Sequence, residues 1–300
     1  MPDSDSFSAL AFDALAQKIP YREISYQGVK LCIKRLDLVH PQISGNKFFK
    51  LKYNFLEAQR LGKSQLLTFG GAYSNHIAAT AYAAHHFGLS SVGIIRGEEL
   101  ADHPLNNTLT TAQQLGMQLH FVSREQYRLK QTAEFLTQLQ LDYPEHYVIP
   151  EGGTNALAIQ GCKEILSTDD LENFDLFCCA VGTGGTITGL IEATTTSQHV
   201  LGFSALKGDF LTQEIQALTM HRHWQITDHY SCGGYAKTTP ALLDFIRVFE
   251  TEYQIPLDHI YTAKMFMGIF DWIAQAKFKP DQRILVLHSG GLQGRLSQIL

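Results

Sequence analysis

A loop of three glycines and two threonines, residues 182–186, has a composition that suits ligand binding. The loop Gly182-Thr183-Gly184-Gly185-Thr186 follows the apolar run LFCCAV and precedes the helical pattern ITGLIEA. Its glycines let the backbone approach a ligand closely, and free amides at a helix N-terminus attract an anion. No lysine follows the last glycine, as a Walker loop requires, and the spacing is not GxGxxG. The context therefore favours a phosphate cradle over the alternative, an ordinary strand–helix turn.

A second loop places a lysine at the start of an amphipathic stretch. In SGNK, Lys47 stands in the first turn of a helix predicted over residues 47–61. The partial positive charge of a helix N-terminus lowers the pKa of an amine, which suits a lysine that forms a Schiff base. Taken alone, however, this loop favours a solvated surface lysine. Spacing does not exclude Lys50 or Lys52 as the reactive amine.

Two further loops add polar groups at the ends of apolar runs. Residues 70–76 offer Ser74, Asn75 and His76 at another helix N-terminus, which suits a carboxylate, the alternative being simple N-capping by Ser74. The closing HSGG places the hydroxyl of Ser289 after the run RILVL, where it could meet a flat ligand. Together the four loops would hold a phosphate, a lysine Schiff base, a carboxylate and a ring nitrogen. That set matches pyridoxal phosphate with an amino acid attached.

The elements that must position these loops alternate between short apolar runs and amphipathic stretches. Such alternation is typical of βαβ units and a parallel sheet, in which ligands bind at the carboxyl ends of strands. Strands are predicted over residues 29–34, 65–69, 91–95, 118–122, 147–149, 176–181, 200–203 and 283–288. Helices are predicted over residues 47–61, 76–87, 107–115, 124–140, 156–166, 186–194, 240–253 and 264–275.

Composition excludes several other classes of protein. The chain has 300 residues, 45% hydrophobic and 18% charged, with a formal net charge of −5 and no basic run. We therefore expect a folded α/β protein that does not bind nucleic acid. No stretch reaches the length of a membrane span, and the acidic N-terminal segment does not resemble an export signal. We expect a cytoplasmic protein with no membrane partner.

Cysteine and histidine patterns predict no disulfide framework and no metal site. The five cysteines are widely spaced without a CxxC, and Cys178 and Cys179 lie in an apolar run typical of a buried strand. The 13 histidines are scattered without an HExxH. Pairs such as His221 and His223 are predicted on helix surfaces.

Four motifs in order resemble one family of enzymes. SGNKFFKLKYN, FGGAYSNHIAATAYAAHHFGL, VGTGGTITG and HSGG resemble the 1-aminocyclopropane-1-carboxylate deaminase and D-cysteine desulfhydrase family, over residues 29–291. The resemblance implies a pyridoxal 5'-phosphate cofactor and the α/β fold of the tryptophan synthase β-subunit (fold type II), with two doubly wound domains. The small domain would span residues 51–153, inserted into a large domain of residues 1–50 and 154–300. The family commonly forms homodimers.

The resemblance also implies a role for each matching residue. Lys47 would bind the cofactor covalently and remove the proton from the substrate α-carbon, assisted by Tyr261 and Ser74. The two pocket tyrosines of the family correspond to Tyr235 and Tyr261, one of which helps proton transfer. Cofactor binding is implied for Lys47, Asn75 (at the ring hydroxyl), Gly182, Thr183, Gly184, Gly185, Thr186 and Ser289, and substrate binding for Ser74, Asn75, His76, Tyr235, Tyr261 and Thr262.

Departures from the family pattern favour one reaction. Phe48-Phe49 replaces the usual Thr-Arg, Thr262 stands where deaminases have Glu, and Ser289 stands where they have an apolar residue. A hydroxyl leaves the pyridine nitrogen largely neutral, which weakens the electron sink that opening a cyclopropane demands. The sequence therefore predicts α,β-elimination on a small amino acid, D-cysteine first, to pyruvate, ammonia and sulfide. The alternatives are cyclopropane deamination, a homologue that binds cofactor or amino acid without turnover, and an unrelated phosphate-binding protein.

Overall fold

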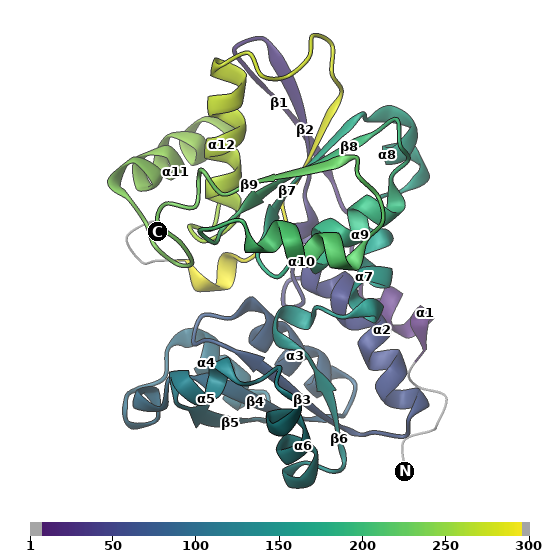
Figure 1. Cartoon of the computed structure of the whole chain (residues 1–300), viewed down its shortest axis with the longest axis vertical. Coiled ribbons are helices and arrows are strands. Elements are labelled where there is room, and N and C mark those ends of the chain that lie inside the picture. Colours follow the sequence, from purple (N-terminus) through teal and green to yellow (C-terminus); the bar gives the residue numbers. More distant parts are fainter. Residues whose placement is uncertain (1–7, 296–300) are drawn as a thin grey trace.

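Two β-sheets, one above the other in Figure 1, organise the chain. The computed structural model describes residues 8–295. The larger sheet has the order β1-β2-β10-β7-β8-β9 and combines strands from both ends of the chain: β1 (Tyr21–Tyr26), β2 (Val29–Lys34), β7 (Leu176–Val181), β8 (His199–Ser204), β9 (Trp224–Thr227) and β10 (Ile284–Leu287). The smaller sheet, β5-β4-β3-β6, is entirely parallel and contains β3 (Gln65–Gly70), β4 (Ser90–Arg96), β5 (Met117–Val122) and β6 (His146–Ile149).

All the predicted strands are present. They could be predicted because central parallel strands are buried on both faces, and their sequences are therefore continuous apolar runs. Every residue of β7 is buried, which confirms Cys178 and Cys179 as core residues. The edge strands β1 and β9 were not predicted. β1 pairs antiparallel with β2 through a two-residue turn, Gln27 and Gly28, whose φ angles are both positive. Four of its six residues are exposed, so its own sequence carries little apolar signal.

Helices cover the sheets and connect them. They are α1 (Ala9–Asp13), α2 (Asn46–Arg60), α3 (Asn75–His86), α4 (Asn107–Gln114), α5 (Arg124–Arg128), α6 (Ala133–Asp142), α7 (Ala156–Lys163), α8 (Thr168–Asn173), α9 (Gly185–Ala193), α10 (Phe210–Leu218), α11 (Pro240–Tyr253) and α12 (Thr262–Ala274). Short 3-10 turns are η1 (Leu36–Leu38), η2 (Glu98–Asp102), η3 (Glu151–Gly153) and η4 (Leu292–Gly294).

Two helix predictions were wrong. The single helix expected over residues 124–140 is two helices, because Ser123 and Thr132 each cap a separate N-terminus with a side-chain hydrogen bond. His221 and His223 lie between α10 and β9 and not on a helix surface. The short helices α1, α8 and α10 were not predicted.

Helices α2, α7 and α9 pack against one another, and α2 and α9 begin at the lysine loop and the glycine loop. The three helices approach closely because α7 and α9 carry glycines. A Cβ on Gly161 of α7 would lie 2.0 Å from the carbonyl oxygen of Phe49, and one on Gly189 of α9 would lie 2.4 Å from Cys162 Cβ. Phe48 and Phe49 are buried in the same core, where Phe48 packs edge-on against Phe12 at 5.0 Å between ring centroids. The departure at positions 48 and 49 therefore serves packing.

The strands of the smaller sheet lie within residues 51–153, and those of the larger sheet lie outside that range. Helix α2 continues unbroken across the boundary predicted at residue 50, so the division into domains stays a prediction. Within residues 8–295, no helix is both long and apolar enough to cross a membrane.

Candidate active site

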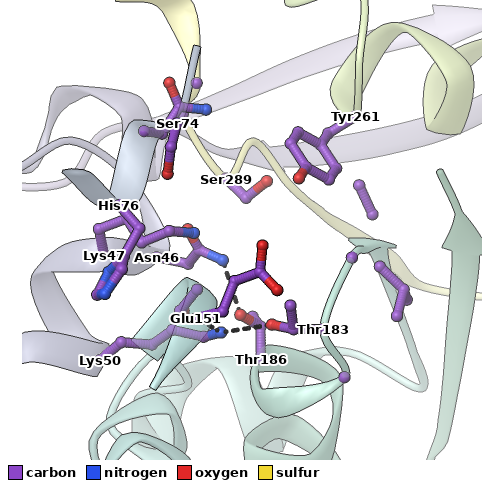
Figure 2. A pocket seen from close by; sticks show the side chains of 18 of the residues that line it. Asn46, Lys47, Lys50, Ser74, His76, Glu151, Thr183, Thr186, Tyr261 and Ser289 are labelled. Atoms are coloured by element: carbon purple, nitrogen blue, oxygen red, sulfur yellow. Dashed lines mark hydrogen bonds between the residues drawn. The ribbon is translucent and has the colours of Figure 1, made fainter. Parts of the chain in front are cut away.

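A cavity of about 260 Å³ lies between the two sheets, where the carboxyl ends of β3, β4, β6, β7 and β10 meet. All four predicted loops line it, as expected for a ligand site in an α/β protein. The predicted residues that line the cavity are Lys47, Ser74, Asn75, His76, Gly182, Thr183, Gly184, Thr186, Tyr235, Tyr261 and Ser289. In Figure 2, Lys47, Lys50 and His76 approach from one side, and Tyr261 and Ser289 approach from the other.

Lys47 lies in the first turn of α2 with its amine inside the cavity. Its Nζ donates to Asn46 Oδ1 at 3.0 Å, and Asn46 Nδ2 donates to Thr186 Oγ1 at 2.7 Å. Burial, reinforced by the positive charge of Lys50, lowers the pKa of Lys47 to about 7. Much of this amine is therefore unprotonated near neutral pH, the form that attacks a carbonyl carbon or accepts a proton.

Gly45 brings the lysine loop against the closing HSGG loop. Gly45 is the N-cap of α2 with φ 68°, and a Cβ there would lie 1.9 Å from the carbonyl oxygen of Ser289. Only glycine tolerates both the positive φ and this approach. The contact holds Ser289 on the cavity wall beside the start of α2.

Lys50, one turn after Lys47, faces the glycine loop. It is only 2% exposed, and its Nζ donates to Gly152 O at 2.9 Å, Thr154 Oγ1 at 3.0 Å and Thr183 Oγ1 at 3.4 Å. No carboxylate of the described residues pairs with it. A buried cation held by neutral acceptors, beside the free amides at the N-terminus of α9, provides a site for an anion. The sequence had identified Lys50 only as a rival of Lys47.

Two predicted site residues do not line the cavity. Gly185 is the first residue of α9 and packs against Thr154 and Lys50. A Cβ there would come 2.9 Å from Thr154 Oγ1 and 3.2 Å from Lys50 Nζ. Thr262 is fully buried, and its Oγ1 donates to Asp258 Oδ1 at 2.7 Å. Asp258 thereby caps the start of α12, also accepting from the backbone N–H of Thr262. The predicted contact of Thr262 with substrate is therefore wrong.

His76 reaches the cavity, but its ring is not a cation. Thr68 Oγ1 donates to Ile149 O at 2.9 Å, so it accepts from His76 Nε2 at 2.7 Å and fixes the proton there. The pKa of His76 lies well below its usual value because of burial and then the charges of Lys47 and Lys50. A neutral ring whose donor is already used cannot bind a carboxylate. That role is left to the first amides of α3, those of Asn75 and His76, which have no acceptor among the described residues.

Tyr235 and Tyr261 form the opposite wall, with ring centroids 6.1 Å apart. Burial is the main cause that raises the pKa of both phenols, and for Tyr261 the neighbouring Tyr235 and Asp258 add to it. Both phenols stay protonated at neutral pH and can therefore donate a proton but not accept one.

Arg96 and Glu151 also line the cavity and were missed from the sequence. Arg96 is the last residue of β4, and Glu151 follows β6 in the turn η3. The available signal was their place at the ends of predicted strands.

Comparison with known proteins agrees with this geometry. A family model described as pyridoxal-phosphate dependent enzyme matches residues 17–290. The chain belongs to this family. It is 31% identical over 301 residues to a bifunctional D-cysteine desulfhydrase/1-aminocyclopropane-1-carboxylate deaminase of Arabidopsis thaliana, covering 91% of this chain and 75% of that protein. It is 28% identical to a D-cysteine desulfhydrase of Serratia proteamaculans, covering 93% of each chain.

The fold expected from the resemblance is confirmed. The crystal structure of a homologue of 1-aminocyclopropane-1-carboxylate deaminase superposes with a TM-score of 0.81 at 26% identity, covering 95% of both chains. The more distant structure of a threonine deaminase isoform from Solanum lycopersicum, at 16% identity and a TM-score of 0.67, shares the fold.

The cavity fits pyridoxal phosphate on its own chemistry. Lys47 provides an amine of low pKa, and Lys50 with the N-terminus of α9 provides a site for the phosphate. The buried Oδ1 of Asn75 has no partner within the described residues and can accept from the ring hydroxyl. Residues 8–295 contain no cluster of three or more His, Cys, Asp or Glu side chains that could hold a metal.

Proposed function

We propose that this pyridoxal-phosphate-dependent enzyme is a lyase that eliminates a β-substituent from a small amino acid. We propose D-cysteine as the preferred substrate and pyruvate, ammonia and sulfide as the products. The observation that carries the proposal is the pairing of a base with an acid across one cavity: Lys47 has a pKa of about 7, and Tyr261 stays protonated. α,β-Elimination needs a base at the α-carbon and an acid for the leaving group.

Several groups of the cavity would bind the cofactor and orient the substrate in this reaction. When bound, pyridoxal phosphate supplies an electron sink for the electrons of the breaking bond at the α-carbon. Lys50 and the amides of α9 would hold its phosphate. The amides of Asn75 and His76 would orient the substrate carboxylate.

Proton transfer would fall to residues on opposite sides of the cavity. Lys47 would take the α-proton, and Tyr261, with Tyr235 beside it, would protonate the leaving sulfur. Ser74 accepts from Ile77 N–H, so its hydroxyl proton remains available to assist at the α-carbon.

Ser289 supports elimination over cyclopropane opening. Its hydroxyl lines the cavity where deaminases have an apolar residue, and it can hydrogen-bond a ring nitrogen without keeping that nitrogen protonated. The name of the Serratia relative points the same way. Thr262 is buried against Asp258 and does not reach the cavity. Cyclopropane deamination is the second candidate, because the name of the Arabidopsis relative includes it and the superposed crystal structure is of a deaminase homologue.

A keto-acid assay on purified protein with added cofactor tests the proposal. Initial rates would be compared on D-cysteine, L-cysteine, D-serine and 1-aminocyclopropane-1-carboxylate. Pyruvate from D-cysteine is expected, whereas 2-oxobutyrate from the cyclopropane would favour the deaminase. Lys47→Ala should abolish turnover, and Lys63→Ala, a change outside the cavity, should not. Absence of any keto acid would refute both candidate activities.

Homodimer formation and cytoplasmic location remain proposals. The homodimer rests on the family resemblance. Light scattering of the purified protein would test the dimer, and a monomeric mass would contradict it.

A further inference from the structure

Arg96 is a positive charge on the cavity wall that the proposed mechanism does not use. It is exposed at the end of β4, and its side chain has no hydrogen-bond or ion-pair partner among residues 8–295. The guanidinium carbon lies 5.8 Å from the ring centroid of Tyr127 and 5.9 Å from that of Tyr235. Stacking on aromatic faces orients a guanidinium while leaving its N–H donors free for a ligand.

The neighbouring carboxylate does not neutralise Arg96. Glu151 Oε1 accepts from Tyr127 OH at 2.7 Å, and its Oε2 lies 3.1 Å from Lys130 Nζ. Both oxygens therefore have partners, and the charge of Glu151 is balanced by Lys130. The wall around Tyr127 keeps one unbalanced positive charge, that of Arg96.

Arg96 lies between the turn that precedes α3 and the tyrosines on the side of the cavity where the leaving group is expected. A Cβ on Gly71 would lie 3.6 Å from Arg96 Nη2, so the guanidinium borders the turn that leads to the carboxylate site at the start of α3. On its other side it contacts Tyr235, whose ring neighbours Tyr261. Arg96, Tyr235 and Tyr261 thus form a row along one wall that ends at the acid assigned to the leaving group.

We propose that this enzyme also takes substrates that carry a second anionic group on the β-substituent, and that Arg96 binds that group. The inference rests on the proposed lyase function and extends its substrate class from D-cysteine to β-substituted alanines with a charged leaving group. The first carboxylate already has the amides of α3, so Arg96 is free for the second. A guanidinium binds phosphate or another oxyanion with two parallel hydrogen bonds.

O-Phosphoserine represents this class and gives a balanced reaction. The Cα–H and Cβ–O bonds break, a Cα=Cβ bond forms from the electrons of the Cα–H bond, and phosphate leaves with the Cβ–O electron pair. The α-proton goes to Lys47. Water then converts the released three-carbon product to pyruvate and ammonia, so that O-phosphoserine and water yield pyruvate, ammonia and phosphate.

Turnover by the holoenzyme tests the role of Arg96. Both enantiomers of O-phosphoserine and serine would be assayed, and the preferred enantiomer kept. Arg96→Gln should lower kcat/KM for O-phosphoserine by about 10- to 100-fold, the effect of losing a charge-assisted hydrogen bond. The decrease for serine should stay within about fivefold, the size of a solvent-screened charge effect. Arg96→Lys, which keeps the charge, should restore part of the loss.

Binding provides a readout that does not depend on turnover. Calorimetry would compare 2-amino-3-phosphonopropionate, whose C–P bond is not eliminated, with alanine. Arg96→Gln should weaken the phosphonate by about 10-fold or more and alanine much less. Arg128→Gln removes the same charge from an exposed position in the last turn of α5, outside the cavity, and should behave as wild type.

Three outcomes would overturn the proposal. In the first, Arg96→Gln weakens serine and O-phosphoserine, or alanine and phosphonate, by equal factors, which would assign Arg96 to the shared carboxylate. In the second, the phosphonate Kd does not change. In the third, the wild-type enzyme binds the phosphonate no better than alanine. If no amino acid yields a keto acid, the lyase function fails, and the calorimetry still decides separately whether Arg96 binds an anion.

Discussion

The lowered pKa of Lys47 leads to a quantitative prediction about the cofactor-free chain. Burial, and then the charge of Lys50, bring this pKa from 10.5 to about 7. At pH 7.5 roughly three quarters of the Lys47 amine would be neutral, against about one part in a thousand for an ordinary lysine. At this pH Lys47 should therefore react with an amine reagent faster than a solvated lysine of equal access, but by less than the ratio of neutral fractions, because a less basic amine is a weaker nucleophile.

Pulse acylation of the cofactor-free protein between pH 5.5 and 9.5, read by peptide mass spectrometry, measures this directly. The acylation rate of Lys47 should rise with pH and level off with an inflection near 7. Lys50→Met removes the nearby like charge and should move the inflection upward, but burial should hold it below the value of free lysine. Pyridoxal phosphate added before the pulse should protect Lys47.

An inflection near 10 in the wild-type chain would refute the reasoning, because it would mean that water in the cavity solvates the Lys47 ammonium fully. An unchanged inflection in Lys50→Met would refute only the part assigned to Lys50.

The lowered pKa of Lys47 also determines the sign of an effect on folding stability. Between about pH 7 and 10.5 the unfolded chain binds the Lys47 proton and the folded chain does not, so this lysine makes stability rise with pH in that window. Lys47→Met should remove that contribution in urea unfolding of the cofactor-free protein.

Two further predictions concern stability. Gly45→Ala should lower the free energy of unfolding by about 3 kcal/mol or more, since the new Cβ meets the carbonyl oxygen of Ser289 at 1.9 Å. Gly62 is the matched control, because its φ is 67° against 68° for Gly45 but a Cβ there would meet nothing within 4 Å. Gly62→Ala should therefore lower the free energy of unfolding by only about 1 kcal/mol. Equal losses for the two variants in thermal unfolding would rule out the collision. Asp170→Ala should destabilise by about 3–5 kcal/mol, because it leaves the buried ammonium of Lys34 without its carboxylate, and a loss below 1 kcal/mol in urea unfolding would show that water reaches this pair.

Local signals in the sequence determined much of the fold. The run LFCCAV predicted a buried strand, and Ser74 was expected to cap a helix and does so through the backbone N–H of Ile77. These features could be predicted because a buried parallel strand and a helix N-terminus each depend on a few adjacent residues. The edge strands β1 and β9 could not, because an exposed strand is stabilised by its partner and not by its own apolar pattern.

The sequence by itself also determined the family and which loops form the cavity, since polar loops after parallel strands meet at one edge of a sheet. Only the tertiary structure decided which way each side chain faces. Lys47 and Lys50 share a helix face, and the packing of α7 and α9 against α2 sends Lys50 to the glycine loop. Arg96 enters the wall because Tyr127 and Tyr235, from distant segments, provide surfaces for it. Thr262 turns away because Asp258 binds its hydroxyl. Spacing places a residue on an element, but its contacts depend on neighbours brought together by packing.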